Sequence, residues 1–173
     1  MTILCITGQP TDTLTPIAEH LYSAGLEKPR SLQREHPIDL PQWHKRVLAN
    51  LTTQAQTRPG ATPTPSRLWE QLAVDLILAN IDSPAWGWAD PSSAQLLDFW
   101  SQLEDSLHFV LICQSPLELI AHTIGNGATL QTDDTAKLLS QWHEQHQNLL
   151  RFHARHPHNS RLILSSDAHK NPQ

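Results

Sequence analysis

The chain has 173 residues, of which 39% are hydrophobic and 17% charged, and we therefore expect residues 1–173 to form a single globular domain with its own core. The formal net charge is −5, with 17 acidic residues against 12 basic ones, so a nucleic-acid partner held by a basic surface is not expected. No apolar run reaches the ~20 residues that span a bilayer, so membrane insertion is not expected either.

The first predicted element is a strand from Ile3 to Thr7, and a helix from Pro16 to Leu26 follows it. Pro16 is acceptable in the first turn of a helix, and Gly25 is expected to end the helix. The chain start lacks the basic residues and the small-residue cleavage site of a signal peptide. Cys5, inside the apolar strand, is expected to be a buried thiol. A cytoplasmic location is therefore the expectation.

Two helices and a short strand are predicted next. The first helix covers Leu40 to Ala55, and a Pro- and Thr-rich connection separates it from a second helix with Ser66 as its N-cap. Trp86 to Trp88 is predicted to be a short strand whose aromatic side chains pack under the sheet. Asp90 is expected to be the N-cap of the next helix, because Pro91 then stands at the first helical position.

The second half of the chain continues the alternation of strands and helices. We predict strands at His108–Cys113 and Arg161–Leu164, and helices at Leu117–Ile124 and Thr135–His153. This pattern predicts an α/β fold: a three-layer sandwich around a doubly wound, mainly parallel sheet. Ligands of such sheets bind at the carboxyl ends of the strands. The loops to consider are then Gly8 to Thr15, Ala89 to Ser93 and Gln114 to Pro116.

Four segments, in order, resemble P-loop-fold sulfotransferases, the family that uses 3'-phosphoadenosine 5'-phosphosulfate (PAPS) as its sulfate donor. Residues 6–15 lie where the family has a strand followed by Gly-x-x-Arg-Ser-Gly-Thr-Ser. Residues 86–93 are similar to its Trp-Gly-aromatic-Lys-Asp-Pro-Arg-Thr. Residues 111–118 resemble a strand ending in Arg-x-Pro-x-Glu, and Trp142 lies on a helix like the one before the family's last strand. The resemblance implies a P-loop NTPase-like, sulfotransferase-like sandwich.

The resemblance also implies a donor site at ten positions: Gly8, Gln9, Pro10, Thr11, Asp12, Thr13, Leu14, Thr15, Gln114 and His122. At several of them the residue differs from the family's. Thr11 and Gln114 replace basic residues, Thr13 replaces a glycine and His122 replaces a serine. Ala89 and Ser92 replace the Lys and Arg of the Asp-Pro motif, and Asp12 adds a negative charge. Burying an anionic donor without cationic partners is costly.

We therefore expect no cofactor, and PAPS only if the protein is active. The leading hypothesis is a sulfotransferase-like protein that has lost donor binding and catalysis and acts as a binding or accessory module, with a protein partner or a larger assembly. The short stretch after Leu164 suggests a minimal version of the fold or a pocket completed by a partner. In the structural alternative, the segment after the first strand is a turn in which Asp12 or Thr13 caps the helix.

Two further hypotheses stay open. An active but divergent sulfotransferase would transfer sulfate to the hydroxyl of a small-molecule acceptor, with His36 or His44 standing where the family has its catalytic base. A metal- or nucleotide-binding protein on the same fold is the other hypothesis. His143 and His146 share a helix face with His153 and could hold Zn²⁺ or Ni²⁺, although a solvated polar face would show the same pattern.

Overall fold

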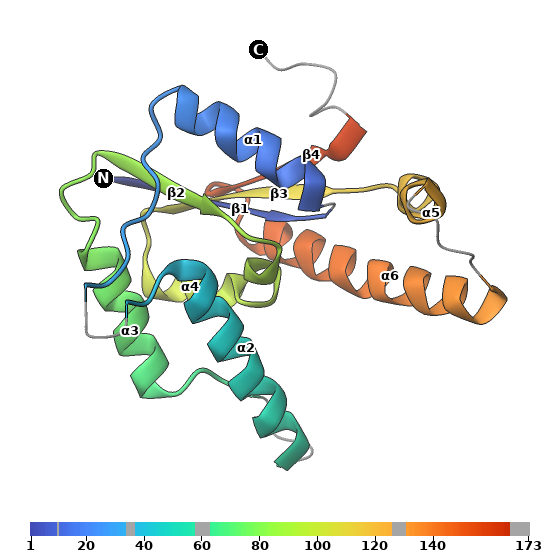
Figure 1. The fold of residues 1–173 in the computed structure, drawn as a ribbon, viewed down its shortest axis with the longest axis horizontal. Coiled ribbons are helices and arrows are strands. Elements are labelled where there is room, and N and C mark those ends of the chain that lie inside the picture. The colour runs from blue at the N-terminus through green and yellow to red at the C-terminus, as the bar shows by residue number, and fades with distance from the viewer. Residues whose placement is uncertain (10, 34–36, 58–62, 126–130, 167–173) are drawn as a thin grey trace.

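A computed structural model of the protein describes residues 1–9, 11–33, 37–57, 63–125 and 131–166 (Figure 1). The elements in chain order are β1 (Thr2–Gly8), α1 (Thr11–Ser23), α2 (Leu40–Thr57), α3 (Arg67–Leu78), β2 (Ala85–Ala89), the short 3₁₀ helix η1 (Pro91–Gln95), α4 (Leu97–Leu103), β3 (Leu107–Cys113), α5 (Pro116–Gly125), α6 (Thr132–Arg155) and β4 (Ser160–Leu164). All four predicted strands are present, within a few residues of their predicted bounds.

The four strands form one parallel sheet in the order β2-β1-β3-β4. β1 lies between β2 and β3, with Cys5 opposite Trp88 on one side and Phe109 on the other. The predicted α/β class and parallel sheet are confirmed. Because all strands run the same way, their carboxyl ends lie at a single edge, which is the edge where ligands of such sheets bind.

Helices cover both faces of the sheet, as Figure 1 shows. Along β1, Ile3 and Cys5 point to one face and Leu4 and Ile6 to the other, as the two-residue period of a strand requires. The first face carries the larger core, built with α2, α3, α4 and α6. The second face packs against α1 in a smaller cluster that includes Leu14. These layers make the predicted three-layer sandwich.

The predicted start of α1 is wrong. The helix begins at Thr11, five residues before Pro16, so Pro16 lies inside it and not in its first turn. Asp12 and Thr13 are consequently helical residues, not the caps of a turn. The reason is tertiary: Leu14 and Ala18, one turn apart, are buried against Ile6 and Ile112 of the sheet, and this burial outweighs the helical hydrogen bond that proline cannot make.

The predicted end of α1 at Gly25 is confirmed. Gly25 has a φ of +109°, a conformation that glycine adopts without strain. The N–H of Gly25 donates to the carbonyl of Tyr22, and the N–H of Leu26 donates to the carbonyl of Leu21. These two bonds form a Schellman motif, which ends the regular helix at Ser23.

Two other predicted helix starts are confirmed in position but not in detail. Asp90 is the N-cap of the next element, but that element is the 3₁₀ helix η1, and α4 begins only after Leu96, whose φ and ψ of −124° and 17° break the helix. The polar sequence Pro-Ser-Ser-Ala-Gln of η1 favours such a short turn over a continuous α-helix. Ser66 stands at the N-cap of α3 but makes no side-chain capping bond.

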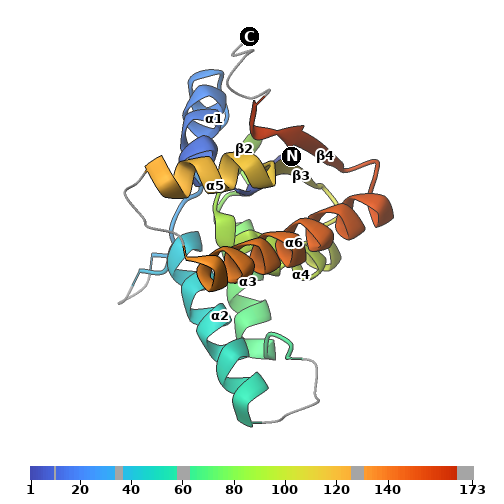
Figure 2. The same ribbon diagram turned by 90° about the vertical axis from the view of Figure 1, so that its right-hand side faces the viewer.

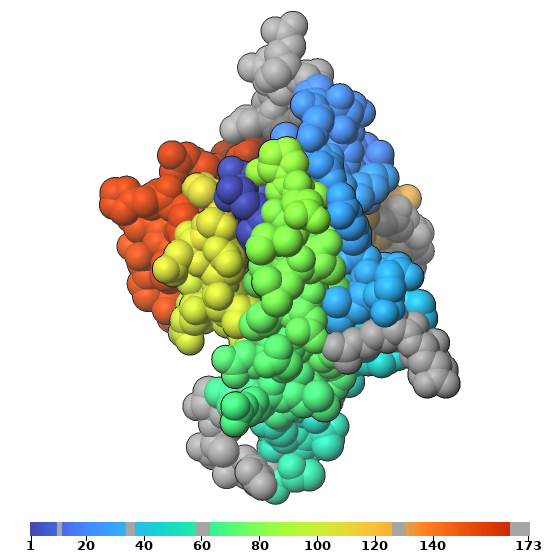
Figure 3. Space-filling view, turned by 90° about the vertical axis from the view of Figure 1, so that its left-hand side faces the viewer, coloured from blue at the N-terminus to red at the C-terminus, as the bar shows by residue number. Residues whose placement is uncertain are grey.

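Backbone contacts close the amino edge of the sheet, and Figure 3 views the molecule from that side. The N–H of Thr2 donates to Pro84, in the segment that leads from α3 into β2. On the outer side of β2, the N–H of Glu27 donates to Ala85 and the N–H of Gly87 donates to Glu27. In the described part of the chain, no helix is both long and apolar enough to cross a membrane.

Candidate functional site

The carboxyl edge of the sheet brings together the loops predicted to form a site. The N–H of Gln9 donates to the carbonyl of Ile112 at 3.1 Å, and the N–H of Asp90 donates to that of Ile6 at 3.0 Å. The hydroxyl of Thr7 donates to the carbonyl of Asp90 at 2.8 Å. Figure 2 views the molecule from this edge, with α1 and α5 beside each other above α6.

The short connection between β1 and α1 offers an anion few backbone N–H groups. Gly8 has a φ of +125°, and a Cβ atom there would lie 2.1 Å from the carbonyl oxygen of Ile112. Only Gln9 and Pro10 separate β1 from α1. The N–H of Gln9 is already bonded, and Pro10, outside the described residues, has no N–H as a proline. A P-loop instead directs several consecutive N–H groups at its phosphate.

The other predicted donor positions in this segment belong to α1. Thr13 and Leu14 are buried, at 1% and 2% exposure, and so face the interior, whereas Thr15 is exposed. The first turn of α1 follows β1 directly at this edge. Asp12 places a carboxylate in that same turn, where the helix dipole stabilises a negative charge.

Two predicted donor positions contact each other across this edge. Nε2 of His122, on α5, lies 3.0 Å from Oδ2 of Asp12, and both side chains are about half exposed. The histidine at this predicted donor position is therefore next to a carboxylate of the protein itself. When His122 is protonated, its charge is matched by Asp12 and is not available to a second anion.

Gln114, the third donor position, lies in the interior with a histidine. Its backbone N–H donates to Nε2 of His146 at 3.0 Å, and its carbonyl accepts the indole N–H of Trp142 at 2.8 Å. Nδ1 of His146 lies 2.8 Å from the carbonyl of Trp142. Because a carbonyl only accepts and a backbone N–H only donates, His146 is neutral with its proton on Nδ1. Burial lowers the pKa of His146 below its usual value.

This arrangement leaves the candidate metal pair incomplete. Both ring nitrogens of His146 are bonded to the backbone, so neither has a free lone pair for a metal ion. Nε2 of His143 lies 2.7 Å from the amide nitrogen of Gln147. Among the residues that the structure describes, no three His, Cys, Asp or Glu side chains gather closely enough to hold a metal ion.

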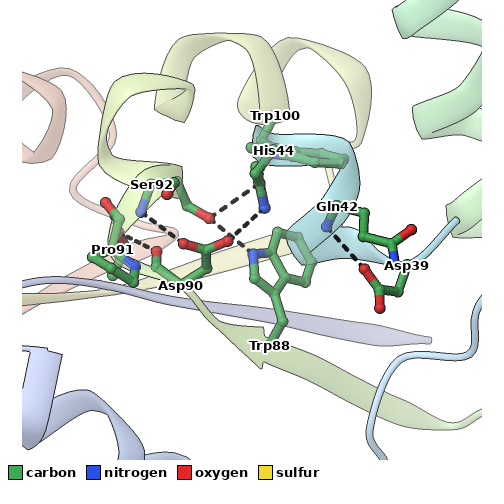
Figure 4. A network of polar contacts seen from close by, with 10 residues as sticks. Asp39, Gln42, His44, Trp88, Asp90, Pro91, Ser92 and Trp100 are labelled. Carbon is green, nitrogen blue, oxygen red and sulfur yellow. Dashed lines mark hydrogen bonds and ion pairs between the residues drawn. The ribbon is translucent and has the colours of Figure 1, made fainter. Parts of the chain in front are cut away.

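His44 is completely buried behind the Asp-Pro turn (Figure 4). It lies in the second turn of α2, which begins after Asp39, whose carboxylate accepts the N–H of Gln42 at 2.8 Å. Nδ1 of His44 lies 2.9 Å from Oδ2 of Asp90, in a contact that lacks the alignment of a full hydrogen bond. Nε2 accepts the indole N–H of Trp100 at 3.1 Å. Because that indole only donates, the ring proton of neutral His44 is on Nδ1, facing Asp90.

The electrostatics of Asp90 follow from these contacts. Burial on its own would raise the pKa of Asp90, but the contact with His44 and the backbone N–H of Ser92 together outweigh it, and the pKa lies below its usual value. The N–H of Ser92 donates to Oδ1 of Asp90 at 2.8 Å. Asp90 is therefore a charged N-cap.

Ser93 extends the contacts into an arrangement that the spacing in the sequence did not reveal. Its hydroxyl lies 3.2 Å from Nε2 of His44 and accepts the indole N–H of Trp88 at 3.0 Å. The series Asp90, His44, Ser93 has the order of contacts of a serine hydrolase triad. Ser93 and His44 are both 0% exposed, however, and a nucleophile or general base must reach its substrate. The arrangement as it stands shapes the turn.

Of the two candidate catalytic bases, the structure describes only His44. His44 does not reach the surface, and its ring is surrounded by Trp43, Trp88 and Trp100, whose ring centroids lie 5.3, 6.3 and 5.7 Å away. His36 lies outside the described residues.

The strand Trp86 to Trp88 packs as predicted, with both tryptophan side chains nearly fully buried under the sheet.

Comparison with known proteins supports the fold. No protein-family model matches the chain, and no curated protein matches it in sequence. Among solved structures, the chain is similar to the sulfotransferase domain from the curacin biosynthetic pathway, with a TM-score of 0.62 and 17% identity over 99% of this chain and 69% of that one. It also matches TT1252 from Thermus thermophilus, with a TM-score of 0.48 and 16% identity over 94% and 87% of the two chains. The protein has a sulfotransferase-like fold.

Proposed function

We propose that this protein keeps a sulfotransferase-like fold, does not bind PAPS, and works as a binding or accessory module. The observation that carries the proposal is the charge of the carboxyl edge. The three segments there, residues 8–15, 89–93 and 113–122, contain no Lys or Arg but three acids: Asp12, Asp90 and Glu118. A donor with several negative charges needs the opposite balance.

The contacts at this edge support the same conclusion. The N–H of Gln9 is bonded to β3, and His122 is paired with Asp12. Losing one partner of a buried charge pair costs roughly 3–5 kcal/mol, which at ~1.4 kcal/mol per tenfold change is a hundredfold or more in affinity. Several such partners differ from the family's at once, so we expect no donor binding at cellular concentrations.

The turn itself is nevertheless well supported. The Asp-Pro segment is held in place by the contact of Asp90 with His44. Two tryptophan N–H groups add to it, one donated to Ser93 and one to His44. These groups are buried and therefore serve the shape of the segment. A fold maintained in this way, with no Lys or Arg in residues 8–15, 89–93 and 113–122, favours a role in binding over sulfate transfer.

The melting temperature with 3'-phosphoadenosine 5'-phosphate (PAP), the product form of the donor, tests the proposal. A ligand at ~100 times its Kd adds ~2.7 kcal/mol to stability, so a Kd of ~10 μM would raise the melting temperature by several degrees at ~1 mM PAP. We expect no shift, either for the natural protein or for Asp12→Asn, which removes the acid of the first turn. A shift in the natural protein would support the active, divergent sulfotransferase instead.

A further inference from the structure

A cleft of about 880 Å³ lies on the face of the sheet opposite α1. Its lining comes mainly from α4, the second half of α6 and residues 63–65, which precede α3. None of its lining residues belongs to the three segments of the donor edge. The volume lies within the ~300–1,000 Å³ typical of small-molecule sites.

The lining of the cleft combines apolar and polar side chains. Its apolar part that a ligand can reach includes Leu51, Phe99 and Leu103, which are only partly buried. The amide side chains of Gln102 and Asn148, both exposed, also contribute to the lining. Apolar side chains beside a few polar groups are the usual character of a site for an organic molecule.

The charged residues of the lining are not equivalent. The guanidinium of Arg155 is held by Asp98, with Nη2 at 2.9 and 3.1 Å from the two carboxylate oxygens. Arg151, one turn earlier on α6, donates only to the neutral amide oxygen of Gln147, at 3.1 Å. Within the described residues no carboxylate lies at ion-pair distance from it. Arg151 is thus the cation of the lining that a ligand would meet. Glu70, on α3, also belongs to the lining.

We propose that the cleft binds a small amphipathic anion, a carboxylic acid with a hydrocarbon or aromatic body. The body lies on Leu51, Phe99 and Leu103, where its burial provides the hydrophobic gain. The carboxylate pairs with Arg151, whose planar fork suits it. Glu70 carries a negative charge, which favours the α6 side of the cleft for the head group.

The test uses the fluorescent probe anilinonaphthalene sulfonate, which combines an aromatic body with an anion, and its displacement by dodecanoate below the concentration at which that acid forms micelles. We expect saturable binding to the folded protein and displacement by dodecanoate but not by dodecylammonium, which has the same chain and the opposite charge. Equal displacement by the two would overturn the assignment of an anion.

Exposed variants locate the site without disturbing the core. We expect Arg151→Gln to weaken dodecanoate binding about tenfold, as the loss of a charge-assisted hydrogen bond implies. Glu70→Gln should leave the affinity unchanged or raise it. Gln102→Trp should abolish binding by filling the cleft, and Arg161→Gln, on β4 outside the lining, is the matched control. The proposal is overturned if Arg151→Gln and Gln102→Trp both bind like the natural protein while remaining folded by circular dichroism.

The cleft and the donor edge can fail separately. PAP binding at the carboxyl edge would overturn the proposed function and leave the cleft untouched, because the two share no residue. Absence of dodecanoate binding would overturn the proposed ligand of the cleft and would leave the proposed function unaffected.

Discussion

Two buried histidines show how single residues hold this fold with different partners. His44 faces a carboxylate through Nδ1 and an indole N–H through Nε2. His146 faces a backbone carbonyl and a backbone N–H. Both are held with the proton on Nδ1, but only His44 is coupled to a charge. The consequences of losing them therefore differ.

Replacing His44 with leucine should destabilise the protein by about 3 kcal/mol, because it leaves the largely buried Asp90 carboxylate and the indole N–H of Trp100 without their partner. Urea unfolding measures the change. The double variant His44→Leu/Asp90→Asn should lose clearly less than the sum of the two single variants, since the contact is lost only once. Additive losses would mean that the two side chains do not interact.

The lowered pKa of His146 predicts a pH dependence of stability. Below about pH 6.5, the usual pKa of histidine, His146 binds a proton in the unfolded chain but not in the folded protein. The free energy of unfolding therefore falls as the pH falls toward the pKa of His146 in the folded protein. Above that window the effect vanishes. Urea midpoints at about pH 7.5 and 5.5 should therefore differ, and His146→Gln should reduce the difference. An unchanged difference in the variant would assign the effect to another group.

At the scale of the elements, local patterns predicted most helices and strands. β3 is an unbroken apolar run, and Gly25 signals the end of α1 by its freedom from steric strain. The start of α1 depends instead on where Leu14 packs, which no local pattern contains. The break at Leu96 was not predicted either. It follows η1, which forms where Asp90 accepts the N–H of Ser92.

Two glycines test the element boundaries against each other. Ala at Gly25 is strained only by its positive φ, because no atom lies within 4 Å of the added Cβ, and should cost roughly 1–2 kcal/mol. Ala at Gly8 meets the same strain plus the carbonyl of Ile112 at 2.1 Å. We expect Gly8→Ala to destabilise β1 and β3 by a clearly larger amount in urea unfolding. Similar losses for the two would show that the turn after β1 is wider than described.

The site was less predictable than the fold, because its contacts cross the chain. The sequence indicated that the loops after β1, β2 and β3 meet, since parallel strands share an edge. It did not indicate that Asp12 pairs with His122, 110 residues apart (122 − 12), or that Ser93 contacts His44. His44 comes from α2, on the face of the sheet opposite α1. Only the packing of α2 decides which residue His44 contacts.

At the scale of the whole molecule, the likeness to a sulfotransferase domain extends over 99% of this chain. A fold of this kind hosts different functions, and the function depends on the residues of its sites. Here the carboxyl edge carries acids and a contact between His122 and Asp12, and a separate cleft carries a cation beside apolar side chains. We therefore propose a separation of the fold from sulfate transfer in this protein.

Calorimetric titration of PAP into the protein at low salt tests that separation most directly, because low ionic strength favours any electrostatic binding that exists. An active sulfotransferase titrated in the same buffer is the positive control. We predict no measurable heat of binding for this protein up to ~1 mM PAP. Saturable binding with a micromolar Kd would contradict the proposal and would support an active, divergent sulfotransferase.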